Sequence, residues 1–198
     1  MSKNSLFSEG QGNSPQDLPQ VLFPQIDILN IEDTTAAFAL RGCLEAWDLQ
    51  VRLTQIPTAQ RLIDILSVPS SLAPTLLLMC HGNKNGLLLP ILAPEIAATM
   101  PYEGTINASQ FHSFLKLEDQ VIINTGCTLG NQEFANAFLE GGCSSYIGAD
   151  GYPEGDSALF YVLHLLFELY CQRTDISTAH EKARAHNEET AYFKLYTC

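Results

Sequence analysis

The chain has 198 residues, of which 46% are hydrophobic and 16% charged, and its formal net charge is −12. This composition is typical of a globular protein and excludes an intrinsically disordered chain. The acidic balance argues against nucleic acid or an anionic membrane as a partner, and no apolar run reaches the roughly 18 residues of a membrane span.

The first third of the sequence alternates between strand and helix patterns. A polar, flexible N-terminal tail is expected over residues 1–20, followed by a single domain over residues 21–198. Periodicity then predicts a strand at 25–31, a helix at 34–47 capped by Asp33 or Thr34, a strand at 49–53, a helix capped by Thr58 and a strand at 75–80. Repeated β-α-β order predicts an α/β fold, with a parallel sheet and helices on both of its faces.

The rest of the chain continues this alternation after a proline-containing stretch, 86–104, in which only a short hairpin arm at Leu87–Leu89 is expected. The further expected elements are a helix from Asn107 to Phe114, a strand at 121–126, a helix at 131–139, a strand at 143–147, an apolar helix at 158–170 and an amphipathic final helix at 177–196. His180 and His186 are expected on the polar face of that final helix.

Six cysteines are scattered along the chain and form no C-x-x-C pair, at Cys43, Cys80, Cys127, Cys143, Cys171 and Cys198. A disulfide framework would be denser and a zinc site would need close pairs. We therefore expect a reducing, cytoplasmic setting and neither a metal nor another cofactor.

Two predicted strands end directly before residues that can carry out nucleophilic chemistry. His81-Gly82 follows the apolar run at 75–80, and Cys127 follows the run at 121–126. In an open α/β sheet, reactive groups collect beyond the carboxyl ends of the strands. A thiol becomes a nucleophile when a nearby imidazole accepts its proton or stabilises its thiolate. The sequence therefore predicts a His–Cys dyad at one edge of the sheet.

These motifs resemble those of the caspase-like (clan CD) cysteine peptidases, most closely the CHAT/separase-like branch. His81-Gly82 with Gly86 is similar to the family's strand-HG-x-x-x-G element, and Cys127 with Gly130 is similar to its strand-C-x-x-G element. His81 and Cys127 are also 46 positions apart, near the roughly 50 of caspases. The resemblance, which covers about residues 25–196, implies a three-layer α/β/α sandwich with a mainly parallel central sheet.

By this resemblance the protein is a cysteine endopeptidase with Cys127 as nucleophile and His81 as catalytic base or acid. The backbone N–H groups of Gly82 and Cys127 are the implied oxyanion hole. Gly82 has no Cβ, so its N–H can approach a substrate carbonyl closely. The implied partner is a protein or peptide substrate. CHAT domains often come with helical repeats that this sequence lacks, so docking or activation is expected to involve a partner protein.

An acidic residue after the strand that follows the nucleophile helps separase-like members to bind a basic side chain. The resemblance assigns this role to Asp156 first, then to Asp150 and Glu154, and so implies cleavage after Arg or Lys. For Asp156 the alternative is that it caps the following helix. A preference for Asp would instead need a basic pocket, for which Arg41 is the only candidate near the right region.

Two alternative functions fit parts of the sequence. A nucleophile-elbow hydrolase places its nucleophile in G-x-[SC]-x-G and its histidine late in the chain, and would use His164, His180 or His186 in place of His81. A catalytically silent caspase-like adaptor would act through protein contacts, with the apolar helix at 158–170 as a partner surface. The intact His81-Gly82 and Cys127 favour the enzyme. No glycine-rich phosphate-binding element follows a strand.

Overall fold

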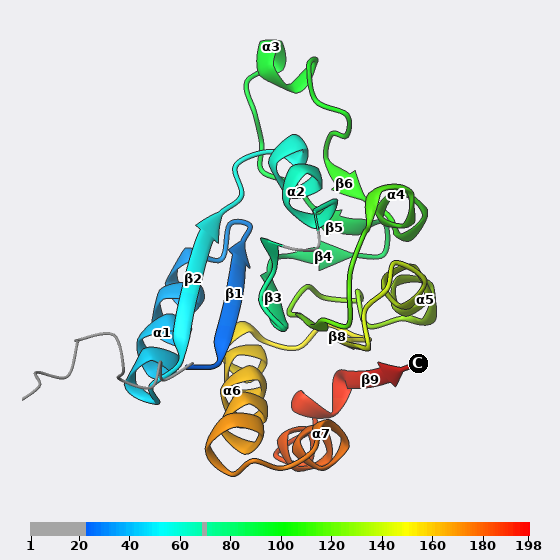
Figure 1. Ribbon diagram of the computed structural model, residues 1–198. Coiled ribbons are helices and arrows are strands. Elements are labelled where there is room, and N and C mark those ends of the chain that lie inside the picture. Colours follow the sequence, from blue (N-terminus) through cyan, green and yellow to red (C-terminus); the bar gives the residue numbers. More distant parts are fainter. Residues whose placement is uncertain (1–22, 69–70) are drawn as a thin grey trace, which may run out of the picture.

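A mainly parallel six-stranded sheet forms the centre of the computed structural model, which describes residues 23–68 and 71–198. The strand order is β2-β1-β3-β7-β8-β9, and every neighbouring pair is parallel except β8 and β9 (Figure 1). The predicted parallel sheet is therefore confirmed, while the predicted tail at 1–20 lies outside the described residues. The strands are β1 (Gln25–Asn30), β2 (Gln50–Gln55), β3 (Thr75–Met79), β7 (Val121–Asn124), β8 (Ser145–Ala149) and β9 (Phe193–Thr197).

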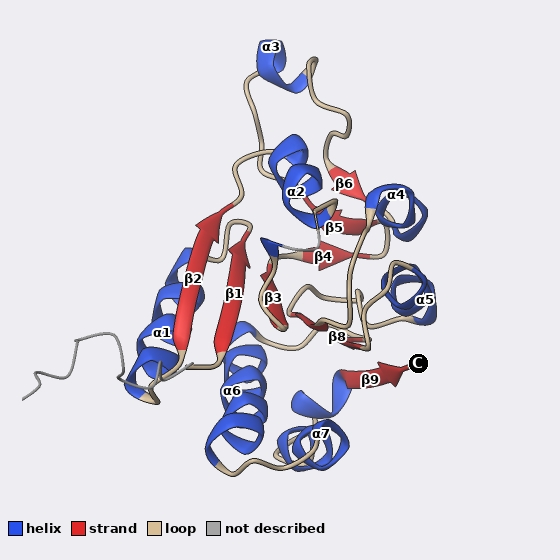
Figure 2. Ribbon diagram, in the orientation of Figure 1, coloured by secondary structure: helices blue, strands red, loops and turns tan. Residues whose placement is uncertain are grey.

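Helices cover both faces of the sheet and complete the three layers (Figure 2). One face is covered by α1 (Thr34–Ala46), α6 (Gly155–Leu166) and α7 (Ile176–Arg184), and the other by α2 (Ala59–Leu66), α4 (Ala108–Phe114) and α5 (Gln132–Glu140). The central strand β3 is buried along its whole length, with Leu76 and Leu78 in one core cluster and Leu77 and Met79 in the other. This two-sided burial explains its continuous apolar sequence.

Several helix starts follow the expected capping chemistry. The Thr58 hydroxyl accepts a hydrogen bond from the Arg61 N–H at the start of α2. The Asn107 side chain accepts from the Gln110 N–H, and the Gln110 side chain accepts from the Asn107 N–H, which makes a capping box at α4. Asp33 occupies the N-cap position of α1 but makes no capping hydrogen bond with its side chain. Its carboxylate is therefore free for another role.

A small second sheet and a projecting arm lie between β3 and α4. The strands β4 (Gly82–Asn83), β5 (Gly86–Leu88) and β6 (Thr105–Ile106) are antiparallel neighbours, which confirms a hairpin where one was expected. The chain between β5 and β6 carries the short helix α3 (Pro94–Ala97) and extends away from the body of the molecule (Figure 1). We call this segment, 89–104, the arm.

The C-terminal segment differs from the predicted helix at 177–196. The helix α7 ends at Arg184, a short 3-10 helix spans Thr190–Tyr192, and β9 then pairs antiparallel with β8. Asn187 and Thr190 exchange hydrogen bonds that turn the chain after α7. Phe193 is fully buried and stacks on Tyr161 with a centroid distance of 3.8 Å. The end of the segment therefore buries its apolar side chains with the spacing of a strand, and not with the spacing of a helix.

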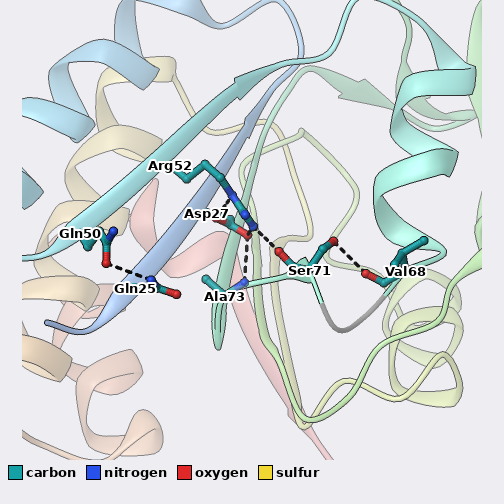
Figure 3. A network of polar contacts seen from close by, with 7 residues as sticks. All are labelled: Gln25, Asp27, Gln50, Arg52, Val68, Ser71 and Ala73. Atoms are coloured by element: carbon teal, nitrogen blue, oxygen red, sulfur yellow. Dashed lines mark hydrogen bonds and ion pairs between the residues drawn. The ribbon is translucent and has the colours of Figure 1, made fainter. Parts of the chain in front are cut away.

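An ion pair between Asp27 and Arg52 connects the edge strand β2 to β1, the next strand of the sheet (Figure 3). The Asp27 side chain on β1 is 3% exposed and accepts two hydrogen bonds from the Arg52 guanidinium on β2, that from Nε at 2.8 Å. It also accepts from the Ala73 N–H at 2.9 Å, and Arg52 donates to the Ser71 carbonyl. One carboxylate thus connects β1, β2 and the segment that leads into β3, and all its charge is compensated by charge-assisted hydrogen bonds.

We expect Asp27→Ala to lower the free energy of unfolding by about 2–3 kcal/mol, because it leaves the Ala73 N–H and the guanidinium without their acceptor. The value is below that of a fully buried pair because the Arg52 side chain is 58% exposed and can be hydrated. Urea denaturation measures the change. The matched control is Glu45→Ala, which removes the exposed pair with Arg41 on α1 and should cost at most about 0.5 kcal/mol. Equal effects of the two substitutions would contradict this role of Asp27.

Candidate active site

His81 and Cys127 line the same hollow at the carboxyl edge of the sheet. They follow the neighbouring strands β3 and β7, which are in register from Thr75–Val121 to Leu78–Asn124. The hollow has a volume of about 110 Å³ and is also lined by residues from β3, from the start of α1 and from the start of α6. His81 is exposed and Cys127 is half-buried. Within the described residues no hydrogen bond joins the His81 imidazole to the Cys127 thiol, although both residues line the hollow.

A buried amide holds the turn that carries Cys127. Asn124 ends β7 and is fully buried. Its side-chain oxygen accepts from the Gly126 N–H at 2.9 Å, and its NH₂ group donates to the Tyr146 hydroxyl at 3.1 Å. Burial raises the pKa of Tyr146 well above its usual value, so the hydroxyl stays protonated and donates to the Leu129 carbonyl at 2.7 Å. The turn is thereby connected at both ends to buried groups.

The same turn is pressed against β8 by a close approach of two glycines. A Cβ on Gly130 would lie 2.1 Å from the Gly148 carbonyl oxygen, a distance that no side chain tolerates. The Gly130 N–H donates to the Ala149 carbonyl at 2.8 Å, and the Thr128 N–H donates to the Gly151 carbonyl at 2.8 Å. Gly130 is therefore required for backbone contact, which gives a physical reason for a glycine three residues after the cysteine.

The backbones of Gly82 and Cys127, which carry the two predicted oxyanion donors, approach each other closely. Gly82 lies opposite Leu87 in β4–β5, and the Leu88 N–H donates to the His81 carbonyl at 2.9 Å. This makes Gly82 part of a non-hydrogen-bonded pair, whose own N–H points away from the partner strand. A Cβ on Gly82 would lie 2.5 Å from the Cys127 carbonyl oxygen. In the described part of the chain, the Cys127 N–H donates to no other residue.

The Cys127 thiol is protonated in the resting protein. Burial raises its pKa, its own backbone N–H opposes this, and the Glu154 carboxylate raises the pKa further. Attack on a carbonyl therefore requires that a base accept the proton. The imidazole that lines the hollow with Cys127 is that of His81.

Two of the three predicted substrate-binding acids are engaged elsewhere. Asp150 forms an ion pair with Lys194 on β9. The Asp156 carboxylate accepts from the Ser157 N–H at 2.7 Å in the first turn of α6. The N-cap position of that helix is held by Glu154, so Asp156 is not the helix cap that the alternative expected.

Of the three predicted acids, Glu154 is the one whose charge affects the pKa of Cys127. It occupies the N-cap position of α6, and its side chain makes no capping hydrogen bond. Its neighbours Pro153 and Gly155 line the hollow, and its carboxylate is among the groups that raise the pKa of Cys127.

Asp33 is a candidate that the sequence reasoning treated only as a helix cap. It is half-buried, lines the hollow together with His81 and Cys127, and makes no capping bond with its carboxylate. Its charge also contributes to raising the pKa of Cys80, after burial. A signal was present in the sequence, because Asp33 follows the first predicted parallel strand and the carboxyl ends of such strands share one edge.

The late histidines of the nucleophile-elbow alternative do not reach the hollow. His180 is 3% exposed, not on a polar face as predicted, and its Nδ1 is 2.6 Å from the Tyr161 hydroxyl. Burial, with a smaller effect of Arg184, lowers its pKa to about 4. His186 packs on Phe160 at a centroid distance of 4.2 Å, and His164 lies on the same helix as Phe160. None of the three lines the hollow at Cys127.

Among residues 23–68 and 71–198, no helix combines the length and apolar character that a bilayer crossing needs. The same residues contain no group of three or more His, Cys, Asp or Glu side chains placed to hold a metal ion.

We expect Glu154→Gln to lower the pKa of the Cys127 thiol, because it removes a negative charge that disfavours the thiolate. The rate of iodoacetamide alkylation at Cys127, followed by peptide mass mapping between pH 6 and about 10, should then rise at lower pH than in the wild type. Asp156→Asn is the matched control and should leave the profile unchanged. A profile that moves equally in both variants, or in neither, would contradict the assignment of Glu154.

Comparison with known proteins reveals the fold but no sequence family. No protein-family sequence model and no curated protein match the chain. Separase in the Saccharomyces cerevisiae separase–securin complex matches 88% of this chain with a TM-score of 0.57 and 13% identity. Gingipain R, an Arg-specific cysteine proteinase, matches 88% with a TM-score of 0.57 and 10% identity. The chain spans 12% of the separase chain and 46% of the gingipain chain. The protein thus has the caspase-like α/β/α fold.

Proposed function

We propose that the protein is a cysteine endopeptidase of the CHAT/separase-like branch, with Cys127 and His81 as its catalytic dyad. The observation that carries the proposal is the hollow at the ends of β3 and β7, which His81 and Cys127 line together. The shared fold with two cysteine proteinases supports it.

The proposed reaction begins when the substrate carbonyl oxygen accepts hydrogen bonds from the N–H groups of Gly82 and Cys127. His81 accepts the thiol proton, and the Cys127 sulfur attacks the carbonyl carbon to form a tetrahedral oxyanion. The oxyanion collapses to a thioester as His81 donates the proton to the leaving amine. His81 then deprotonates a water molecule, which hydrolyses the thioester and regenerates the thiol. Exposure of His81 gives that water access.

We further propose that cleavage follows a basic residue, with Asp33 and Glu154 as the acids that select it. Asp33 lines the hollow with a carboxylate that caps no helix, and Glu154 lies between Pro153 and Gly155, which line the hollow. Met79, Ala36 and Leu159 supply apolar walls for the methylene groups of an arginine or lysine. The Arg-specific gingipain R has the same fold. Asp150, engaged with Lys194, and Asp156, engaged with Ser157, are weaker candidates.

A protein partner and a cytoplasmic setting complete the proposal. The matched separase structure is a complex with securin, and this chain spans 12% of that separase chain. We propose that this chain likewise binds a protein partner, for substrate docking or activation. All six cysteines are free, as expected in a reducing compartment.

The adaptor alternative needs the apolar helix at 158–170 as an exposed partner surface, but much of that helix is buried. In α6, Tyr161, Val162 and Leu165 are fully buried against the sheet, so its apolar face belongs to the core. Phe160 is 42% exposed and is covered on one side by His186. Phe167 is 37% exposed and packs against Trp47. The segment 158–170 therefore offers two separate exposed aromatic rings rather than a continuous docking face.

We expect a peptidyl acyloxymethyl ketone with arginine next to the reactive group to add one label to the wild type, detected by intact mass. Cys127→Ala should abolish the label, and His81→Ala should slow labelling about a hundredfold or more, because the thiol loses its base. His186→Ala is the control histidine and should label at the wild-type rate. A folded wild type that resists the Arg, Lys and Asp probes alike would overturn the peptidase proposal.

We expect Asp33→Asn to reduce kcat/KM for an Arg-containing peptide about a hundredfold, since an uncompensated guanidinium would then enter the hollow. The rate on a matched peptide with glutamine in place of arginine should stay within about threefold, because no charge is lost there. Asp64→Asn, an exposed aspartate on α2, serves as the matched control. An equal fall on both peptides would show that Asp33 has a structural role instead.

A further inference from the structure

A second hollow lies at the base of the arm, on the other face of the sheet. It has a volume of about 110 Å³ and lies between the arm and the N-terminus of α2. Its walls are mainly apolar and include Ala59, Leu89, Ile91, Ala97 and Tyr102. A cavity of roughly 150 Å³ with apolar walls accommodates benzene, so this hollow is of the size that accepts one aliphatic side chain.

Ile91 stands at the mouth of this hollow with its side chain in water. It is 97% exposed, whereas Leu89, two residues earlier, is 7% exposed and belongs to the core. Covering such an exposed aliphatic residue with an apolar group lowers the free energy of the system. Glu103 is the one charged residue in the lining. The chemistry of the hollow therefore favours an uncharged aliphatic group over an anionic one.

The chain segment that lines this hollow follows His81 in the sequence, after the hairpin of β4 and β5. His81 leads into Gly82 on β4, β4 pairs with β5, and the Leu88 N–H donates to the His81 carbonyl. Leu89 is the next residue, and its N–H donates to the Gly104 carbonyl on the far side of the arm. The hollow with Cys127 is lined by residues of α1 and α6, whereas this one is lined by residues at the start of α2, and these helices cover opposite faces of the sheet. His81 and Gly82 are thus at the edge between them.

We propose that the arm hollow binds an aliphatic side chain of the peptide substrate, from one of the first three residues on the leaving-group side of the cleaved bond. The inference rests on the proposed function. The basic side chain enters the hollow with Asp33, the scissile carbonyl meets Gly82, and the leaving amine is the group that His81 protonates. The peptide beyond that amine passes His81 toward the opposite face. Three extended residues span roughly 10 Å, enough for a side chain to reach the wall that begins at Leu89.

Matched peptides test this subsite. Each carries arginine before the cleaved bond and either leucine or aspartate at the first, second or third position after it. Binding of fluorescent peptides to Cys127→Ala is measured by anisotropy, and kcat/KM is measured with the wild type. We expect leucine to be favoured over aspartate about tenfold at one position, in both binding and kcat/KM. Ile91→Ser should reduce that preference to about twofold.

The control is Ile96→Ser, which changes a second isoleucine of the same arm that is 50% exposed and outside the hollow. It should keep the tenfold preference. If the enzyme cleaves these peptides without preferring leucine, or if both variants lose the preference equally, the subsite is wrong and the peptidase stands. If the wild type neither cleaves the peptides nor reacts with the label, the anisotropy measurement of peptide binding to Cys127→Ala still tests the subsite. Leucine-dependent binding that Ile91→Ser weakens supports the subsite, and equal or absent binding overturns it.

Discussion

The buried Asn124 amide is the interaction on which the geometry of the candidate site depends. A parallel strand that ends inside the protein leaves polar groups that water cannot reach, and each must find a partner. Asn124 supplies both an acceptor for the Gly126 N–H and a donor for the Tyr146 hydroxyl. The turn after β7 is therefore fixed before any substrate arrives, and the Cys127 N–H is left unused by the rest of the chain. A preorganised donor of this kind needs no rearrangement during a reaction.

Under the proposed function, the charge around the thiol represents a compromise between selecting a substrate and activating a nucleophile. Carboxylates that attract a basic side chain also disfavour a thiolate, and Glu154 has this second effect on Cys127. The two effects are opposed only while the hollow is empty of cations. Once a guanidinium or ammonium group neutralises the carboxylates, their influence on the thiol falls. A basic substrate of the proposed kind thus favours ionisation of the nucleophile that attacks it.

The sequence predicts the central strands well, and it places His81 and Cys127 at the same edge of the sheet, because both depend on local patterns. β3 and β7 are apolar on both faces, and His81 and Cys127 follow their ends directly. The last segment is mispredicted because 177–196 satisfies a helical pattern, while β9 depends on pairing with β8 and on the stacking of Phe193 against Tyr161. The same long-range pairing places Lys194 beside Asp150. Asp33 was missed for a different reason: it follows the end of a predicted parallel strand, but it also fits the pattern of a helix cap, and that local interpretation was preferred.

The raised pKa of Cys127 also bears on how the protein withstands oxidants. Peroxide reacts with thiolates much faster than with thiols, and the further products, sulfinic and sulfonic acids, are generally irreversible. A half-buried cysteine that remains protonated at rest presents little thiolate to such reagents. In the proposed reaction, the same feature that makes Cys127 depend on a base would also protect it between turnovers, and the time of greatest oxidative risk would be the time when a substrate occupies the hollow.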